Sequence, residues 1–592
     1  MKRFITVMIS LMMLISIGFG QGFRYRSQKS GNWNDVTTWE VNYEKNKWMN
    51  ATTVPDITSK MISISRHDVV TVTSNIDVDS VTIISMGTLT LTAPMSLNSL
   101  LSNDGTLNSN GNLTLISNAS ETATIDGKSN GVINGNVTMQ RYLPSKFGYK
   151  YFSSPFTGAT VGEFSDDMDL TATFTTFYKY DENRVVNGTP VSGWINYKTP
   201  TGVLESLRGY CVNFGTDATP TTVDVTGIVN NGNISLPLYN NNNTYTKGFN
   251  LVGNPYPSPI DWYASSGWTK TNIDDALYFF KASDTQQYGG EYQTLIGGIS
   301  SDGKVSRIIP SMQGFFVHVK DGVYPVAGAL GMTNAVRTNN LTQSFAKGGE
   351  SSTSSKGGFS LLRFTAGFTD YTKNMDYSVV YFGEKATVEF NGQTDAYKMM
   401  NSDTNVPNIY EVSPLGTKTS IKNLPFGADT TYNISLGVKI LRDGDVVIKL
   451  KDIEGEFANM NSITLYDKER NVEQDLLKGQ EYVVTLKKGE YLGRFFLKFS
   501  NATTTINTFT TAIDDRVIDN STNIFTTSYG SMKVYTDKGG DLRLYNQMGQ
   551  LVAEYNIADG GEYEFTPNVR GFVIASFVSG GNKVTKKLIF NN

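Results

Sequence analysis

The side chains that most often carry enzymatic chemistry are scarce in this chain. Its only two histidines, His67 and His318, stand 251 positions apart. A catalytic triad with a histidine base, or a zinc site built on several histidines, needs such side chains close together. We therefore assign no catalytic residue and no metal ligand from the sequence.

Paired carboxylates leave one enzymatic alternative open, because a glycoside hydrolase needs only two Asp or Glu residues whose spacing is set by the fold. Asp166, Asp167, Asp169, Asp274 and Asp275 are candidates, but they lie in polar stretches typical of solvated turns. The chain has no GxxxxGK(S/T) phosphate loop and no complete Asp-x-Asp-x-Asp-Gly calcium loop. We expect no cofactor, and calcium binding by loop carboxylates is an alternative without a motif.

Aromatic side chains offer a second kind of chemistry, stacking against sugar rings or a partner surface. The chain holds 6 Trp, 31 Tyr and 32 Phe, so many rings are available for such contacts. The ligand-binding candidates in its middle part are Trp194, Trp262, Tyr263 and Trp268. The alternative is that these rings fill the cores of β-sandwiches or pack beside prolines.

Trp33 and Trp39 form a separate pair near the N-terminus, six positions apart across a polar turn. Such a pair either caps the end of a β-stack or stacks on sugars. Cys211 is the only cysteine, which excludes an intramolecular disulfide. Because its neighbours Tyr210 and Val212 are apolar, we expect a buried strand thiol and not a nucleophile.

Composition indicates which elements position these side chains. Hydrophobic residues make up 39% of the 592 residues, charged residues only 18%, and glycine is frequent, a balance that favours strands and turns. The length predicts three or four domains, so we expect an all-β, multidomain fold. The net charge is −4 and basic residues are not clustered, which argues against a nucleic-acid partner.

The N-terminal residues have the pattern of a secretory signal. Lys2 and Arg3 precede an apolar run that ends at Phe19, and Gly18 and Gly20 supply the small residues of a cleavage site. We expect a signal peptide over residues 1–20. The rest of the chain contains no apolar run long enough for a membrane-spanning helix.

Short alternating runs separated by glycine turns fill residues 21–139. Gly87 and Gly105 are 18 positions apart, and Gly111 and Gly131 are 20 apart, which is the coil length of a short β-solenoid. A solenoid-like module is our first prediction here, and a sandwich the second. The expected order then continues with an aromatic-rich β-sandwich over 140–337, a flexible linker over 338–358, a β-sandwich over 359–500, a hinge over 501–515 and a small β-sandwich over 516–592.

The last of these segments reads as a self-contained β-module. Asp541–Val552 alternates and breaks at Gly549, as two strands joined by a tight turn would. Gly571–Phe577 and Lys583–Phe590 follow as two more strands, with a glycine-rich turn over Ser579–Asn582.

This module resembles the C-terminal sorting domain of proteins exported by the bacterial type IX secretion system. The matching residues are Leu544, Tyr545, Gly549, Gly571, Lys586 and Lys587. Many members open with Tyr-Pro-Asn-Pro, whereas Asn523–Tyr529 occupies that place here. The resemblance implies the type IX machinery as a partner, export across the inner and outer membranes, and a secreted or cell-surface location.

Together these observations predict an exported, modular surface or secreted protein, more an adhesin or structural component than an enzyme. The proposed contacts are weak and multivalent, made by loops and exposed aromatic rings on rigid β-scaffolds with glycans or surface proteins. The alternative is an extracellular carbohydrate-binding protein or glycoside hydrolase.

Overall fold

The computed structural model describes residues 23–44, 47–342, 359–427, 430–500, 507–510, 522–526, 531–536, 538–546, 550–569, 571–580 and 582–590. Strands joined by turns and short 3-10 helices make up these residues, with no α-helix among them. The chain divides into two compact units, Met1–Ala512 and Ile513–Asn592. The predicted all-β, multidomain class is confirmed.

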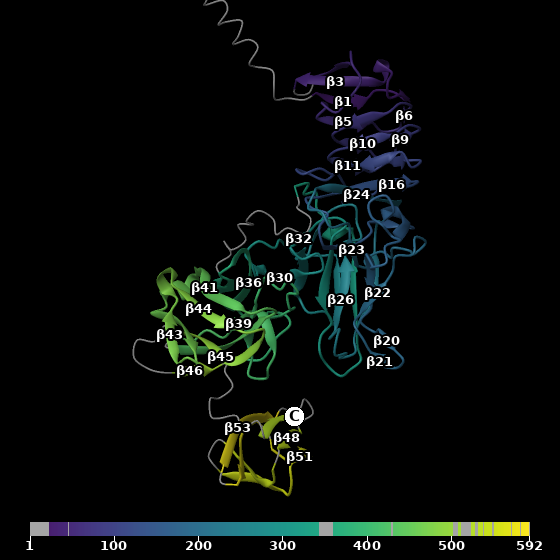
Figure 1. Cartoon of the computed structure of the whole chain (residues 1–592). Helices are drawn as coiled ribbons and strands as arrows, with labels where there is room; N and C mark the ends of the chain where they lie inside the picture. Colours follow the sequence, from purple (N-terminus) through teal and green to yellow (C-terminus); the bar gives the residue numbers. More distant parts are fainter. Residues whose placement is uncertain are drawn as a thin grey trace, which may run out of the picture. The chain divides into compact units, whose positions relative to one another are not determined.

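Residues 61–143 form a stack of coils in which each coil contributes one strand to each of three parallel sheets (Figure 1). Each strand pairs with the strand one coil later, so the sheets extend along the stack. The strands are β5 (Met61–Ile64), β8 (Val81–Ile83), β11 (Leu100–Asn103) and β14 (Thr124–Ile125); β6 (Val69–Val72), β9 (Thr88–Leu91), β12 (Thr106–Asn108) and β15 (Val132–Asn134); and β7 (Ile76–Val78), β10 (Met95–Leu97), β13 (Leu113–Leu115) and β16 (Val137–Leu143).

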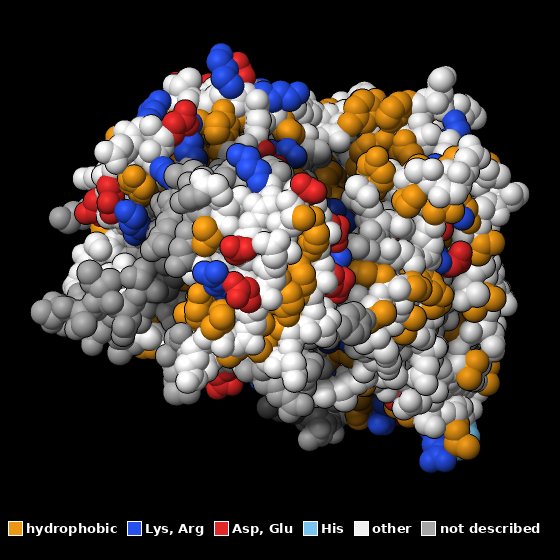
Figure 2. Space-filling view, turned by 90° about the horizontal axis from the view of Figure 1, so that it is seen from below, with side chains coloured by type: hydrophobic (Ala, Val, Ile, Leu, Met, Phe, Trp, Pro, Cys, Tyr) orange, Lys and Arg blue, Asp and Glu red, His pale blue; other side chains and the backbone are white. Residues whose placement is uncertain are grey.

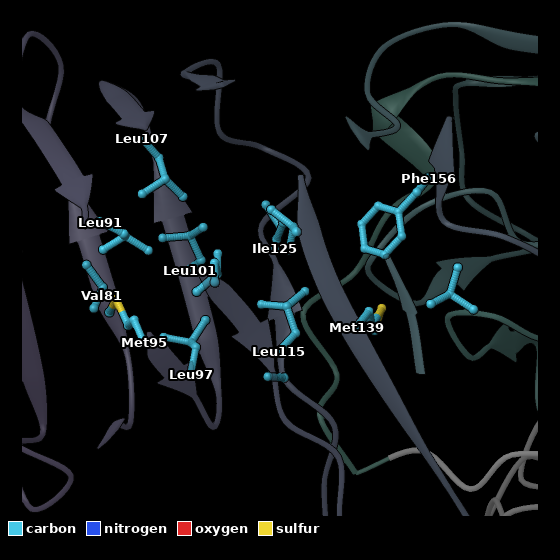
Figure 3. Close-up of a cluster of buried hydrophobic side chains, with 14 of the residues drawn as sticks. Val81, Leu91, Met95, Leu97, Leu101, Leu107, Leu115, Ile125, Met139 and Phe156 are labelled. Carbon is cyan, nitrogen blue, oxygen red and sulfur yellow. The ribbon is translucent and has the colours of Figure 1, made fainter. Parts of the chain in front are cut away.

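The coil stack is held together by columns of identical or similar side chains. Val78, Leu97, Leu115 and Met139 are successive partners on one sheet, and all four are fully buried. Figure 3 shows side chains of these columns pointing into the common interior. Because strand side chains alternate between faces, apolar residues point inward while the Thr and Ser between them face outward.

Glycines shape one corner of the coil stack. A Cβ added to Gly105 would lie 2.3 Å from the carbonyl oxygen of Gly87, and one on Gly131 would lie 2.5 Å from that of Gly105. The same carbonyls accept hydrogen bonds from Thr106 and Val132 of the next coil. The glycines therefore repeat at this corner because no side chain fits between successive coils.

The N-terminal end of the stack is covered by β1 (Arg24–Ser27), β2 (Gly31–Asn32), β3 (Trp39–Glu44) and β4 (Lys47–Asn50). Trp33 and Trp39 are fully buried there, edge to face with ring centroids 4.8 Å apart. Their indole N–H groups donate to the carbonyls of Pro55 and Trp33. This pair is a buried cap, as the first of the two interpretations expects, and has no ring face free for a sugar.

Strand β16 joins the coil stack to the aromatic-rich part of the chain. One edge pairs in parallel with β13, and the other pairs antiparallel with β24 (Thr221–Val229), so the strand crosses the expected boundary at residue 140. Beyond it lie a sheet of β17 (Tyr149–Phe152), β23 (Tyr210–Asn213), β19 (Phe177–Tyr180) and β22 (Trp194–Asn196), and a sheet of β26 (Phe249–Gly253), β33 (Gly314–His318), β29 (Leu277–Ala282), β30 (Gly290–Ile296) and β31 (Ile299–Ser300).

These two sheets share a buried aromatic core that includes Tyr151, Tyr180, Phe280 and Phe316. Side chains of the next region, such as Tyr381, belong to the same core. The regions on either side of the expected linker are thus packed together, which agrees with their membership in one compact unit. Most of that linker, residues 343–358, lies outside the described residues.

The strands between 359 and 510 form one twelve-stranded sheet, where the sequence predicted a sandwich. The path runs β43 (Val472–Asp475), β42 (Ser462–Asp467), β45 (Gly489–Ser500), β40 (Thr430–Ile440), β38 (Asn408–Val412), β39 (Lys418–Leu424), β36 (Tyr371–Phe382), β35 (Ser360–Phe368), β41 (Gly444–Glu454) and β44 (Glu481–Leu486), with β37 (Ala396–Tyr397) on β39 and β46 (Asn507–Thr510) on β40. Tyr482 near one end donates to Asp467 near the other, 2.7 Å away. Two of its long strand pairs contain bulges, which increase the local twist of a sheet, and the sheet curls around its own core into a nearly closed barrel.

The second unit is a small sandwich, as predicted. Its sheets are β47 (Thr522–Thr526), β48 (Met532–Thr536) and β51 (Gly561–Phe565), and β50 (Leu551–Ile557), β49 (Gly540–Tyr545), β52 (Gly571–Ser579) and β53 (Asn582–Phe590). Ile524 and Val534 from one sheet and Leu542, Val573 and Phe577 from the other share one core. The predicted turn joins β52 to β53, with Gly580 in the left-handed region.

Candidate functional site

Three of the predicted stacking residues are engaged within the protein. Trp262 is fully buried, and its indole packs edge to face on Trp268 with centroids 4.8 Å apart, while Lys270 Nζ lies 3.6 Å from its centroid. Trp268 and Tyr263 are partly buried against the same core. Both tryptophans also donate their N–H groups to backbone carbonyls, Trp262 to Asp275 and Trp268 to Asp261. The three rings pack against the core, and the Lys270 ammonium lies over them in cation–π contacts.

Trp194, the fourth candidate, lies in a chain of aromatic rings that leads from the core to the surface. On its inner side it packs on Tyr180, 4.9 Å between centroids, and on Phe316. On its outer side it meets Tyr178, which in turn packs on Tyr149. Trp194 is half-buried, so its indole is not fully exposed. The series of contacting rings therefore extends from the aromatic core to the surface through Trp194.

Phe174 and Tyr288 form the exposed end of this chain of rings, and we call them the aromatic pair. Their side chains are 52% and 54% exposed, and their centroids are 4.6 Å apart. Tyr288 also contacts Tyr149 at 6.1 Å, which links the pair to the buried rings. The structure thus presents two contacting rings to solvent beside a half-buried third ring.

The loop that carries Phe174 is tied down on both sides of the ring. Lys198 donates to the carbonyl of Ala172, and Tyr149 Oη donates to that of Thr175 at 3.1 Å. Asn196 Nδ2 donates to Thr175 Oγ1 at 2.8 Å. The exposure of Phe174 is therefore imposed by its surroundings, because the Lys198 and Tyr149 side chains bind the loop backbone on both sides of the ring and Asn196 binds the Thr175 hydroxyl.

The turn that carries Tyr288 is fixed by hydrogen bonds within the turn itself. Ser283 N–H donates to the Gly289 carbonyl, and Gly289 N–H donates to that of Gln286, both at 3.0 Å. Ser283 Oγ accepts from the N–H groups of Thr285 and Gln286. Both rings thus sit on preformed backbone and lose little conformational entropy when a ligand binds.

The titratable groups near the aromatic pair suit stacking better than acid–base chemistry. Burial raises the pKa of the Tyr149 phenol well above its usual range, so it stays protonated and donates to Thr175. Burial likewise raises the pKa of the Cys211 thiol behind it. Cys211 is a buried strand thiol, as expected, and at neutral pH it is not a thiolate.

Three of the five carboxylates considered for hydrolysis have structural roles. Asp274 is buried and bonds to His318 Nδ1 at 2.7 Å, and Asp275 pairs with Lys270 at 2.9 Å. Asp169 is exposed and accepts from the N–H and hydroxyl of Thr171. Burial, reinforced by the negative charge of Asp166, raises the pKa of Asp167 to about 7. His67, by contrast, is exposed on the coil stack, far along the chain from these groups.

Among the residues that the structure describes, no three or more His, Cys, Asp or Glu side chains are grouped so as to hold a metal ion. Within the same residues no helix is long and apolar enough to cross a membrane. On the face drawn in Figure 2, basic side chains lie among acidic ones. The signal-peptide prediction for residues 1–20 lies outside the described residues.

The residues of the sorting-domain resemblance lie on the larger sheet of the second unit. Leu544 is fully buried in its core, and Tyr545 at the end of β49 is half-buried. Gly571 opens β52 with φ +76°, a conformation that favours glycine. Lys586 and Lys587 pair with Ala575 and Ile574 across β53 and β52, and Gly549 lies outside the described residues.

Among curated proteins, none matches. Among solved structures, the chain is similar to a "Biofilm associated protein - BSP domain", at 10% identity over 77% of this chain and 92% of that chain, with a TM-score of 0.12. A likeness this weak supports no inference about function. Residues 25–499 match the family "Domain of unknown function (DUF8693)", so the chain belongs to that family.

Proposed function

We propose that this chain is an exported surface adhesin and that the aromatic pair is its contact with extracellular glycans. The observation that carries the proposal is the pair itself, two half-exposed rings held out by tied loops. Aromatic rings bind sugars through the apolar face of the pyranose, and fixed rings bind at low entropic cost. The half-buried Trp194 and Tyr149 behind the pair keep it rigid.

The size of the aromatic pair favours a glycan over a protein partner. A large aromatic side chain buries about 150–250 Å² when covered, so two half-exposed rings offer about 200 Å². A stable protein interface needs about 800 Å² on each side. The pair suits one or two sugar rings, and many copies on a surface would add avidity to this weak contact.

Export is the second part of the proposal. It is supported by the signal-like residues 1–20 and by the resemblance of the C-terminal residues to type IX sorting domains. The separate compact unit at Ile513–Asn592 is compatible with a module that acts independently of the rest. Deletion of residues 516–592 should leave the protein inside the cell envelope, and unchanged delivery to the surface or medium would refute this part.

Binding of the protein to a glycan array and to insoluble polysaccharides tests the contact. We expect the wild-type chain to retain at least one polysaccharide and the F174A/Y288A variant to lose it. Tyr245→Ala is the matched control, because Tyr245 is 67% exposed and lies outside the aromatic pair. Equal binding by wild type and F174A/Y288A would show that the pair is not the contact, and release of reducing sugar would favour the hydrolase alternative.

A further inference from the structure

A second site is independent of the aromatic pair and lies at the last coil of the coil stack. A pocket of about 330 Å³ opens between residues 125–133 of that coil and the end of β24. Its walls include Asp126, Asn130, Val132, Asn231 and Arg337. This volume is at the lower end of the range for small-molecule sites, enough for one or two sugar units.

Arg337 is the one fixed positive charge in this wall. It is only 7% exposed, and its guanidinium packs over the buried ring of Tyr256 at 5.1 Å. Nε donates to Ser258 Oγ and Nη2 to the carbonyl of Ile125, both at 2.6 Å. These neutral partners on two sides fix the plane of the guanidinium.

The third nitrogen is less well satisfied. Nη1 reaches Asn231 Oδ1 and Asn334 Oδ1 only at 3.4 Å, beyond the usual range for a hydrogen bond. Ile125 and Asn231 both line the pocket, so Nη2 and Nη1 both lie on its side, and Nη1 is the one of the two without a short partner. A bound acceptor there would replace two long contacts with a charge-assisted hydrogen bond.

The charge of Arg337 is not balanced locally. In the described part of the chain no carboxylate comes within ion-pair distance of its guanidinium, although Asp126 acts on it from further away. Burial lowers the pKa of Arg337 to about 10, so it stays charged at neutral pH. A buried cation without a counter-ion is costly, and an anionic ligand would relieve that cost.

The remaining walls supply what a sugar ring needs. Asn130 and Asn231 place exposed amide side chains at the rim, and amides both donate to and accept from hydroxyl groups. The Asp126 carboxylate can accept hydrogen bonds from ligand hydroxyl groups, and it would repel a negatively charged group of a ligand placed next to it. Val132 is 56% exposed and offers an apolar face beside them.

We propose that this pocket binds the uronic acid unit of an acidic polysaccharide, with the carboxylate on Arg337 Nη1 and the ring hydroxyls on the rim amides and Asp126. A neutral sugar would leave the Arg337 charge unbalanced, and a phosphate monoester, with a charge of about −1.5 to −2 at neutral pH, would bring more negative charge toward Asp126. A peptide carboxylate would satisfy Arg337 but would leave three hydroxyl-binding groups at the rim unused.

Isothermal titration calorimetry of the full chain with digalacturonate, digalactose and a tripeptide with a free C-terminal carboxylate tests this assignment. We expect digalacturonate to bind at least tenfold more tightly than digalactose and the tripeptide, and to weaken as salt is raised. Equal affinity for digalactose, equal affinity for the tripeptide, or no binding of digalacturonate would each overturn the proposal.

Substitutions at Val132 separate binding from folding, because its side chain is half-exposed in the rim. Val132→Glu should weaken digalacturonate at least tenfold by placing a second negative charge near the ligand, while Val132→Gln should change it less than threefold. Both should melt within a few degrees of wild type. Unchanged affinity in Val132→Glu would refute the site. The F174A/Y288A variant should keep full digalacturonate affinity here, since the two sites are independent.

Discussion

The energetic share of each ring in the aromatic pair can be predicted from its exposure. Phe174 is 52% exposed and Tyr288 is 54% exposed, so each presents about 100 Å² of the 150–250 Å² that such a ring can bury. At about 25 cal/mol per Å², full coverage of one ring by a sugar contributes at most ~2.5 kcal/mol. Since binding also orders the ligand, we expect each single alanine variant to lose about tenfold in affinity, or ~1.4 kcal/mol.

The two substitutions should not be independent. The rings contact each other with centroids 4.6 Å apart, and aromatic pairs interact by about 0.5–1.5 kcal/mol beyond their buried area. Removal of Phe174 takes away the nearer ring neighbour of Tyr288 and leaves only its contact with Tyr149 at 6.1 Å, so part of the second loss is already present in the first variant. We expect the double variant to lose less than the product of the single losses, with a coupling of about 0.5–1.5 kcal/mol.

Titration of the four proteins with the polysaccharide that the wild type retains measures this cycle, and thermal unfolding monitors the fold. Because half of each ring is already solvated, we expect the melting temperatures to stay within a few degrees of wild type. Strictly additive losses would refute the idea that the rings act as one surface. A loss of the same size in Tyr245→Ala would refute the assignment of binding to the pair.

Three further predictions concern the scaffold. Gly105→Ala should destabilise the coil stack by about 1–3 kcal/mol, because the added Cβ would lie 2.3 Å from the Gly87 carbonyl oxygen. Gly489→Ala, at an open position, should leave the stability unchanged, and thermal unfolding of the two variants measures the difference. Lys422→Met should lower the free energy of unfolding by about 3–5 kcal/mol, because it leaves the fully buried Asp395, with which Lys422 pairs at 2.7 Å, without its counter-ion. Denaturant unfolding measures this change, and a decrease below ~1 kcal/mol, typical of an exposed pair, would contradict the prediction. Burial raises the pKa of Glu291 from 4.5 to about 7, and the positive charge of Lys281 acts in the opposite direction. The folded state therefore binds this proton more tightly than the unfolded state, and the free energy of unfolding falls as pH rises from about 4.5 to 7. Glu291→Gln should flatten this dependence in melting curves taken from pH 4 to 8, and an unchanged slope would show that other groups cause it.

Local sequence pattern indicated the coil stack as the first of two alternatives, but only one of the two glycine spacings marks a coil, because Gly131 lies at the corner of Gly105, 26 positions earlier, and not at that of Gly111. The spacing of Gly87 and Gly105 equals one coil because both residues occupy the same corner, where the carbonyl of one coil leaves no room for a side chain on the next. The last coil breaks the period, with Leu115 and Met139 paired 24 positions apart. Extra residues in a surface turn leave the inward-facing columns intact, so such an insertion weakens the sequence repeat without breaking the structure.

Sheet closure was not predictable in the same way. The strands between 359 and 500 were recognised from their alternation, but alternation says only that one face is buried, and both a sandwich and a curled sheet satisfy it. The decision depends on accumulated twist and on long-range contacts such as that of Tyr482 with Asp467. The Arg337 pocket could not be predicted from the sequence for a related reason, because its walls come from residues more than two hundred positions apart, such as Asp126 and Arg337.

The sequence did not single out Phe174 and Tyr288, because three of the four stacking candidates were chosen as tryptophans. Tryptophan is the largest side chain, and in this fold its area is needed to close cores: Trp33 and Trp39 cap the coil stack, and Trp262 is fully buried. Phe174 opens the aromatic run over residues 174–180, whose pattern predicts a strand, but the strand begins only at Phe177 and leaves Phe174 in the preceding loop. Tyr288 stands in a polar stretch. The exposure of Phe174 follows from contacts made by other residues, such as Tyr149 with the Thr175 carbonyl. In this protein both exposed rings stand on backbone that hydrogen bonds hold in place, which keeps the rings from packing onto the core, and the size of the aromatic residue does not mark such positions.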